Sequence, residues 1–171
     1  METAVIKHNI FDDLKQLTKF GLSLSVVFSS VAGYFLAADV VDVKTVLLLA
    51  VGGYCMVGAS NAYNQIIERG PDAVMKRTMN RPIPAGRMSA NTALMIAVVL
   101  TILGLVILYN INERTALFAA ISIFLYTSAY TPLKPITPLS VFVGAIPGAI
   151  PFMLGWVAAT GEFGIEPGIL F

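Results

Sequence analysis

Residues 61–87 have the sequence NAYNQIIERGPDAVMKRTMNRPIPAGR. This segment holds two of the ten acidic residues and five of the eleven basic residues of the 171-residue chain, and long apolar runs flank it on both sides. If those runs cross a membrane, the segment gathers charges of both signs, amides and prolines at the membrane edge. We therefore expect the chemistry of the protein to lie there.

The flanking runs are long enough to span a membrane. Hydrophobic residues make up 57% of the chain and charged residues 12%, against about a quarter for soluble domains. Five apolar runs approach the roughly 20 residues that a membrane helix needs: residues 17–38, 45–66, 90–109, 115–130 (which is short) and 139–160. The sequence predicts an all-α polytopic membrane protein embedded in a lipid bilayer.

Two other segments have a recognisable pattern. A polar arm, residues 1–16, precedes the first run, and DDLKQLTKF predicts a short amphipathic helix at the interface. The last run contains Gly144-x3-Gly148, Pro147 and Pro151. This composition predicts a broken helix that packs against protein or a cavity.

The basic residues give the topology. Nine of the eleven lie at the N-terminal arm and at the ends that follow the second and fourth runs, and only Lys44 and Arg114 lie at the opposite ends. The positive-inside rule places the N-terminus in the cytoplasm. A cleaved signal peptide is an alternative for the first run, but the long arm with Asp12 and Asp13 is unlike a short basic leader.

A stripe of oxygen ligands enters the membrane at the end of the second run. Asn64, Glu68 and Asp72 are spaced by four residues, so successive positions drift only about 40° around a helix. Asn61 lies three residues before Asn64 and is expected on the same face. Amide and carboxylate oxygens suit Mg²⁺, which typically bridges carboxylates to substrate phosphates.

Basic residues that can bind phosphate oxygens surround the stripe: Arg69, Lys76, Arg77, Arg81 and Arg87. The alternative is a solvated helix end with ordinary basic residues beside it.

Gly70-Pro71 interrupts the helix, and we expect Gly70 just past its end and Pro71 at the start of a new short helix.

The net charge of +1 gives no general attraction to nucleic acid. The single cysteine, Cys55, is expected to be a small buried side chain.

Several motifs occur in order along the chain. They are Asn64-x3-Glu68-x3-Asp72 within ASNAYNQIIER, then MKRT at 75–78, RPIPAGR at 81–87, YTPLKPITPLS and GAIPGAIPFMLGWVAATG. With them the chain resembles the UbiA superfamily of intramembrane prenyltransferases, and within it the branch that farnesylates haem. The resemblance runs from about residue 17 to the end.

The resemblance implies a single prenyltransferase domain over residues 1–171, with about five transmembrane helices of a nine-helix bundle. It implies farnesyl transfer from farnesyl diphosphate to a vinyl group of protohaem IX (haem B), making haem O in the inner membrane. Proteins of haem A biosynthesis or oxidase assembly would be possible partners. It implies Mg²⁺ as cofactor, bound by Asn64, Glu68 and Asp72. The diphosphate would contact Arg69, Lys76, Arg77 and Lys134.

The chain departs from the family at two points. Gly70 stands where the family usually has an acidic residue, and the second acidic motif and the haem-associated histidines are absent from these 171 residues. We therefore expect the chain alone to be inactive and to be the N-terminal part of a longer protein, whose coding DNA would continue beyond Phe171.

Other functions are open on the same residues. They are a prenyltransferase for an aromatic or quinone precursor, and a truncated, non-catalytic membrane module. A CDP-alcohol phosphotransferase would need an Asp-Gly-x2-Ala-Arg signature, which the chain does not contain.

Overall fold

The computed structural model describes residues 9–170, and every regular element in that range is a helix. Residues 1–8 of the predicted arm, with Lys7, lie outside the described residues, as does Phe171. The elements are α1 (Ile10–Leu17), α2 (Phe20–Ala37), α3 (Val43–Ile67), α4 (Arg69–Val74), α5 (Ala90–Tyr109), α6 (Glu113–Phe124), the π-helix η1 (Leu125–Tyr130), α7 (Thr131–Leu133), α8 (Ser140–Thr160) and α9 (Ile165–Leu170).

Five helical segments in the described range are long and apolar enough to cross a membrane, which confirms the predicted all-α polytopic fold. The fourth is longer than predicted, because η1 and α7 continue α6 without a break and give a 21-residue span, Glu113–Leu133. The first is shorter than predicted, because the chain turns at Thr18 and Lys19 between α1 and α2.

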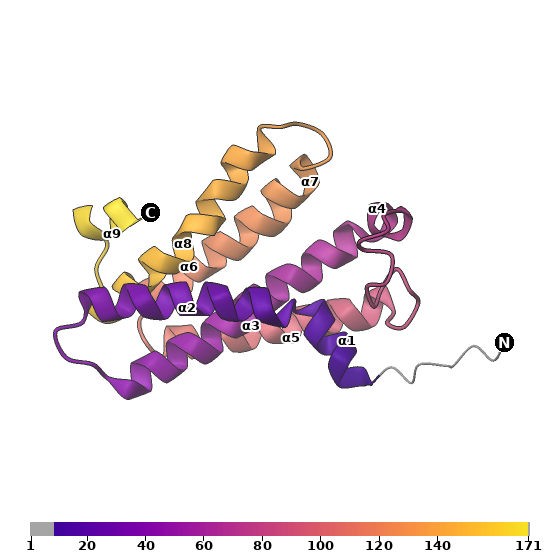
Figure 1. The fold of residues 1–171 in the computed structure, drawn as a ribbon. Coiled ribbons are helices and arrows are strands. Elements are labelled where there is room, and N and C mark those ends of the chain that lie inside the picture. The colour runs from indigo at the N-terminus through magenta and orange to yellow at the C-terminus, as the bar shows by residue number, and fades with distance from the viewer. Residues whose placement is uncertain (1–8, 171) are drawn as a thin grey trace.

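The long helices pack with neighbours both near and far in sequence. α3 packs on α5 and α2, α2 on α8, and α6 on α8. Figure 1 shows α2, α3 and α5 running alongside one another, with the α6–α8 pair leaning away from them. One end of the bundle carries α1, α4 and α7, and the other carries α9 and the α2–α3 connection. The segment that the sequence singled out therefore lies at the end where α1 and α7 also lie.

Helices α2 and α8 approach each other so closely that their backbones touch. A Cβ atom at Gly155 would lie 1.8 Å from the Ser30 carbonyl oxygen, and one at Gly33 would lie 2.0 Å from that of Phe152. Membrane helices use such small residues because lipid gives them no hydrophobic drive to associate, so close van der Waals contact must supply it.

Helix α8 is continuous from Ser140 to Thr160, so the prediction that its prolines break it is wrong. Because Pro151 has no N–H, the Pro147 carbonyl loses its usual helical donor. The Ser122 hydroxyl of α6 donates to that carbonyl at 3.4 Å. A neighbouring helix thus supplies the missing hydrogen bond, which is how membrane helices tolerate internal proline.

We expect Gly155→Ala to lower the apparent melting temperature of the detergent-solubilised protein by about 5 °C, because the added methyl group must push α2 and α8 apart. Gly148→Ala on the same helix is the matched control, since open space surrounds its Cβ position. Equal melting temperatures for the two variants would contradict the close α2–α8 contact.

Candidate functional site

The site is built where α3 ends and α4 begins. α3 ends at Ile67, Glu68 is the cap residue shared by both helices, and α4 begins at Arg69. The expected break at Gly70-Pro71 is therefore wrong by two residues. Pro71 lies in the first turn of α4, where a missing N–H leaves no helical hydrogen bond unmade. The Asp72 N–H donates to the Glu68 carbonyl at 2.8 Å, so the turn between the helices is tight.

Asp72 is buried with its charge paired. It is 1% exposed, and Arg81 Nη1 donates to its Oδ2 at 2.5 Å. The Thr78 hydroxyl donates to the Asp72 carbonyl at 3.0 Å. These contacts fold the loop that follows α4 back over Asp72, so this carboxylate faces the bundle and not the solvent.

The other two predicted ligands are also held by cations from distant segments. Lys134, which follows α7, donates to Glu68 Oε1 at 2.9 Å. Lys19, between α1 and α2, donates to Asn64 Oδ1 at 3.3 Å. Each of the three oxygen-bearing side chains therefore has its own cation. We call this set the oxygen–cation cluster: Asn64, Glu68, Asp72, Lys19, Lys134 and Arg81.

The charges of the cluster lie close enough to act on one another. Burial is the main cause that lowers the pKa of Lys19, to about 8 from its usual value of 10.5, and the positive charge of Arg81 adds to it. Glu68 opposes that shift by favouring the ammonium form. Lys19 is thus a desolvated cation, and a further anion beside it would be bound strongly.

Lys19 was missing from the predicted site residues, and Arg81 was considered only as a general phosphate contact. Lys19 lies at the start of the first apolar run, residues 17–38, and this start is expected at the same membrane edge as residues 61–87. That position was the one available signal, because only the tertiary fold brings Lys19 to Asn64.

Asn61 does not belong to the stripe, which corrects the prediction that it shares a face with Asn64. Its Nδ2 donates to the Thr18 carbonyl at 3.2 Å and to the Ser23 hydroxyl at 3.3 Å. Its side chain therefore binds the α1–α2 connection. Asn64, Glu68 and Asp72 remain as the candidate ligands, one in α3, one at the junction and one in α4.

The remaining basic residues differ in their surroundings. Arg69, Lys76 and Arg77 are exposed and make no hydrogen bond or ion pair with any described residue. Arg87 binds α1 instead, with Nε 2.8 Å from Asp13 Oδ1. Of the four predicted diphosphate contacts, the structure brings only Lys134 into contact with a predicted ligand.

The donor set fits Mg²⁺ in part. No cluster of three or more His, Cys, Asp or Glu side chains occurs among residues 9–170. Glu68 Oε2 and Asp72 Oδ1 accept no hydrogen bond from the described protein, so each carboxylate keeps an oxygen for a cation. Mg²⁺ is commonly bound by one or two carboxylates, with substrate phosphates and water completing its shell.

Three hollows lie between the cluster and the bundle interior. Glu68 and Lys134 line a groove of about 420 Å³. Lys134 and Tyr126 line a second, wider groove, and Tyr126 also lines a cavity of about 150 Å³ between α2, α3, η1 and α8. That cavity is mainly apolar, with Asn61 at its edge. Lys134 and Tyr126, which each line two of these hollows, place the hollows next to one another between the cluster and the interior.

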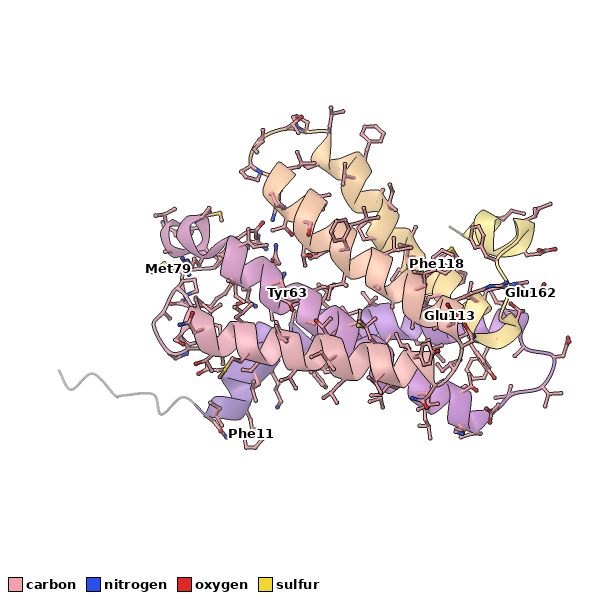
Figure 2. All side chains as sticks on the ribbon, turned by 180° about the vertical axis from the view of Figure 1, so that it is seen from behind. Phe11, Tyr63, Met79, Glu113, Phe118 and Glu162 are labelled. Atoms are coloured by element: carbon pink, nitrogen blue, oxygen red, sulfur yellow. The ribbon has the colours of Figure 1, made fainter. Side chains whose placement is uncertain are left out.

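Figure 2 shows the side chains around this end of the bundle. Phe11 of α1 and Met79 of the loop after α4 mark it, whereas Glu113 and Glu162 lie at the opposite end. Glu113 and Glu162, which do not belong to the cluster, thus lie at the end of the bundle opposite the cluster.

The sequence and fold have clear relatives. A protoheme IX farnesyltransferase of Christiangramia forsetii is 71% identical over 163 residues, which are 95% of this chain and 54% of that protein. One of Flavobacterium psychrophilum is 68% identical over 95% of this chain and 55% of that protein. The chain spans about half the length of these relatives.

Two solved structures share the fold. A structure described for digeranylgeranylglyceryl phosphate synthase matches with a TM-score of 0.83 and 23% identity, over 94% of this chain and 56% of that one. A UbiA homologue from Archaeoglobus fulgidus bound to DMAPP and Mg²⁺ matches with a TM-score of 0.81 and 16% identity, over 92% of this chain and 58% of that one. These likenesses support a UbiA-like helical bundle.

Residues 26–171 match the sequence model of the UbiA prenyltransferase family. The five long apolar helices and this match together make the chain part of a multi-pass membrane protein. The chain belongs to the UbiA prenyltransferase family.

Proposed function

We propose that this chain supplies the prenyl-diphosphate site of a protohaem IX farnesyltransferase, which makes haem O from haem B and farnesyl diphosphate. The observation that carries the proposal is the oxygen–cation cluster, whose Glu68 and Lys134 line a groove beside an apolar bundle interior. Farnesyl diphosphate has the matching shape, with a highly charged head and an apolar tail. The identity with protoheme IX farnesyltransferases supports haem as the acceptor.

In this proposal Asn64, Glu68 and Asp72 hold Mg²⁺ through their side-chain oxygens. The bound ion would neutralise negative charge on the departing diphosphate. Two ligand oxygens, Glu68 Oε2 and Asp72 Oδ1, are open to it without breaking an existing hydrogen bond.

The cations of the cluster then bind the diphosphate. Lys19, Arg81 and Lys134 stand beside the ligand oxygens, so small side-chain movements transfer their N–H donors to phosphate oxygens. When the bond between the farnesyl C1 and the diphosphate oxygen breaks, the electron pair leaves with the diphosphate, and these charges stabilise it. The π electrons of the haem vinyl group then form a bond to the farnesyl C1, and until that bond forms the apolar cavity keeps water from the allylic cation. Water then adds to the carbocation left beside the porphyrin ring and loses a proton, which gives the hydroxyl group of haem O.

The predicted contacts Arg69, Lys76 and Arg77 take a different part in this proposal. They are exposed in the structure, so they reach the diphosphate only if α4, which begins at Arg69, and the segment after it move towards the diphosphate. We assign the mouth of the site to the cytoplasmic side of the inner membrane, because basic residues collect at this end. Partners in haem A biosynthesis or oxidase assembly belong to the same proposal.

Binding of farnesyl diphosphate should depend on Mg²⁺ and on Glu68. We expect Glu68→Gln to weaken that binding at least tenfold, because a neutral amide is a poorer Mg²⁺ ligand than a carboxylate. A tenfold loss of affinity corresponds to about 1.4 kcal/mol of binding free energy. Isothermal titration of the protein expressed from its complete gene, in nanodiscs with and without Mg²⁺, measures this. Glu113→Gln at the opposite end of the bundle is the control. An unchanged affinity in Glu68→Gln would argue against the site.

Removing Arg81 should destabilise the protein, and Mg²⁺ should restore the lost stability. Arg81→Met leaves Asp72 buried and unpaired, at a cost of about 2–3 kcal/mol, reduced because Arg81 is partly exposed. Thermal unfolding with and without Mg²⁺ is the measurement. Arg87→Met is the matched control, since it breaks a similar ion pair with the buried Asp13. Recovery by Mg²⁺ in both variants, or in neither, would contradict a metal site at Asp72.

The acceptor is tested with the protein expressed from its complete gene, so that any segment beyond Phe171 is included. Membranes containing it are incubated with farnesyl diphosphate, Mg²⁺ and either haem B or 4-hydroxybenzoate. We expect farnesylated haem by mass spectrometry, and Asp72→Asn to reduce its rate at least a hundredfold, the scale of one electrostatic transition-state contact. A prenylated benzoate product would assign the chain to the aromatic-acceptor alternative, and no product from either acceptor would favour the non-catalytic module.

A further inference from the structure

The connection between α1 and α2 contains a backbone conformation that lysine rarely adopts. Thr18 caps α1, and Lys19 follows with φ 47° and ψ 60°, in the left-handed region. Among residues 9–170, Lys19 is the one non-glycine residue with positive φ. Glycine enters this region freely, whereas a residue with a Cβ atom is strained there. A connection with no other task would therefore be better served by glycine.

Two amide side chains of α3 hold this connection in place. Gln65 is fully buried, and its Nε2 donates to the carbonyls of Gln16 and Leu17, each at 2.9 Å. Asn61, one turn earlier, donates to the carbonyl of Thr18 at 3.2 Å. Carbonyls at a helix C-terminus lack helical donors. The three consecutive carbonyls before Lys19 are thus each bound by a side chain of α3.

Gln65 is bound through its donor group alone, because its Oε1 has no hydrogen-bond partner in the described protein. A buried amide oxygen without a partner is costly. The side chain is nevertheless held in this orientation by its two contacts with the backbone of α1. The unpartnered oxygen of Gln65 and the strained backbone of Lys19 both indicate that α3 holds the α1–α2 connection in a conformation that its own residues do not favour.

The ammonium group of Lys19 is bound by the same stretch of α3. Asn64 lies directly before Gln65, and its Oδ1 accepts from Lys19 Nζ at 3.3 Å. We propose that Asn61 and Gln65 are positioning residues, which impose the left-handed backbone on Lys19 and so direct its ammonium group to Asn64 and the diphosphate. The contact of the ammonium group with the diphosphate rests on the proposed function. The rest of the inference rests on the structure of the α1–α2 connection.

The first test needs no ligand. Lys19→Gly and Lys19→Met both remove the ammonium group, but only glycine relieves the backbone strain. We expect Lys19→Gly to melt about 2–4 °C above Lys19→Met. In a Gln65→Met background this difference in melting temperature should disappear. The α1–α2 connection is then no longer held by Gln65, so residue 19 can leave the left-handed conformation. A gap that is absent in the original background, or that persists in Gln65→Met, overturns the inference.

The second test uses Mg²⁺–farnesyl diphosphate in nanodiscs. We expect Gln65→Met to weaken binding about tenfold on its own, but less than about twofold in a Lys19→Met background, because coupled neighbours are not additive. Asn112→Leu is the control, since this amide donates to the Val157 carbonyl at 3.1 Å at the other end of the bundle. It should lower stability without changing affinity.

The outcomes separate the two proposals. Equal losses from Gln65→Met in both backgrounds would make Gln65 a general stabilising residue and overturn the inference while leaving the site intact. A failure of the unmodified protein, expressed from its complete gene, to bind Mg²⁺–farnesyl diphosphate would count against the proposed function. The melting temperatures of the glycine and methionine variants would still decide whether Gln65 imposes the conformation of Lys19.

Discussion

Polar groups that enter an apolar helical bundle must find their partners within the protein, because neither lipid nor apolar side chains can replace water as a hydrogen-bond donor or acceptor. This constraint explains the arrangement at one end of the present bundle. Asp72 is paired with Arg81, Glu68 with Lys134 and Asn64 with Lys19, and each cation comes from a different segment of the chain. The end of α3 and the start of α4 therefore hold two segments that are distant in sequence, and the loop that follows α4.

The same pairing leaves the site with a small positive charge before any ligand arrives, because three cations lie beside two carboxylates and one neutral amide. A carboxylate buried without a cation is strongly destabilising. Arg81 and Lys134 lie beside Asp72 and Glu68, and both cations are themselves suited to bind phosphate. In the proposed enzyme, an incoming metal–diphosphate pair would bring a cation and an anion together, with little net charge moved into the bundle.

The sequence was most informative where local composition determines structure. Hydrophobic length identified the five spans, and the spacing of Asn64, Glu68 and Asp72 identified side chains that the fold places at one end of the bundle. Errors arose where a neighbour decides the local geometry. Asn61 was assigned to the wrong face, because helical periodicity gives an angle but does not say which helix lies against it. The contact of Lys19 with Asn64 spans 45 residues of sequence and left no local pattern.

The contact between Arg87 and Asp13 has a consequence for how the protein is made. These residues are 74 positions apart, and Arg87 also binds Gln16 in α1. At a synthesis rate of about 5–20 residues per second, α1 leaves the ribosome roughly 4–15 s before its partner. During that interval two helices must enter the bilayer while α1, with its charged residues, waits at the surface. The order of synthesis therefore separates α1 from one of its partners, so α1 makes this contact only after α2 and α3 have been synthesised.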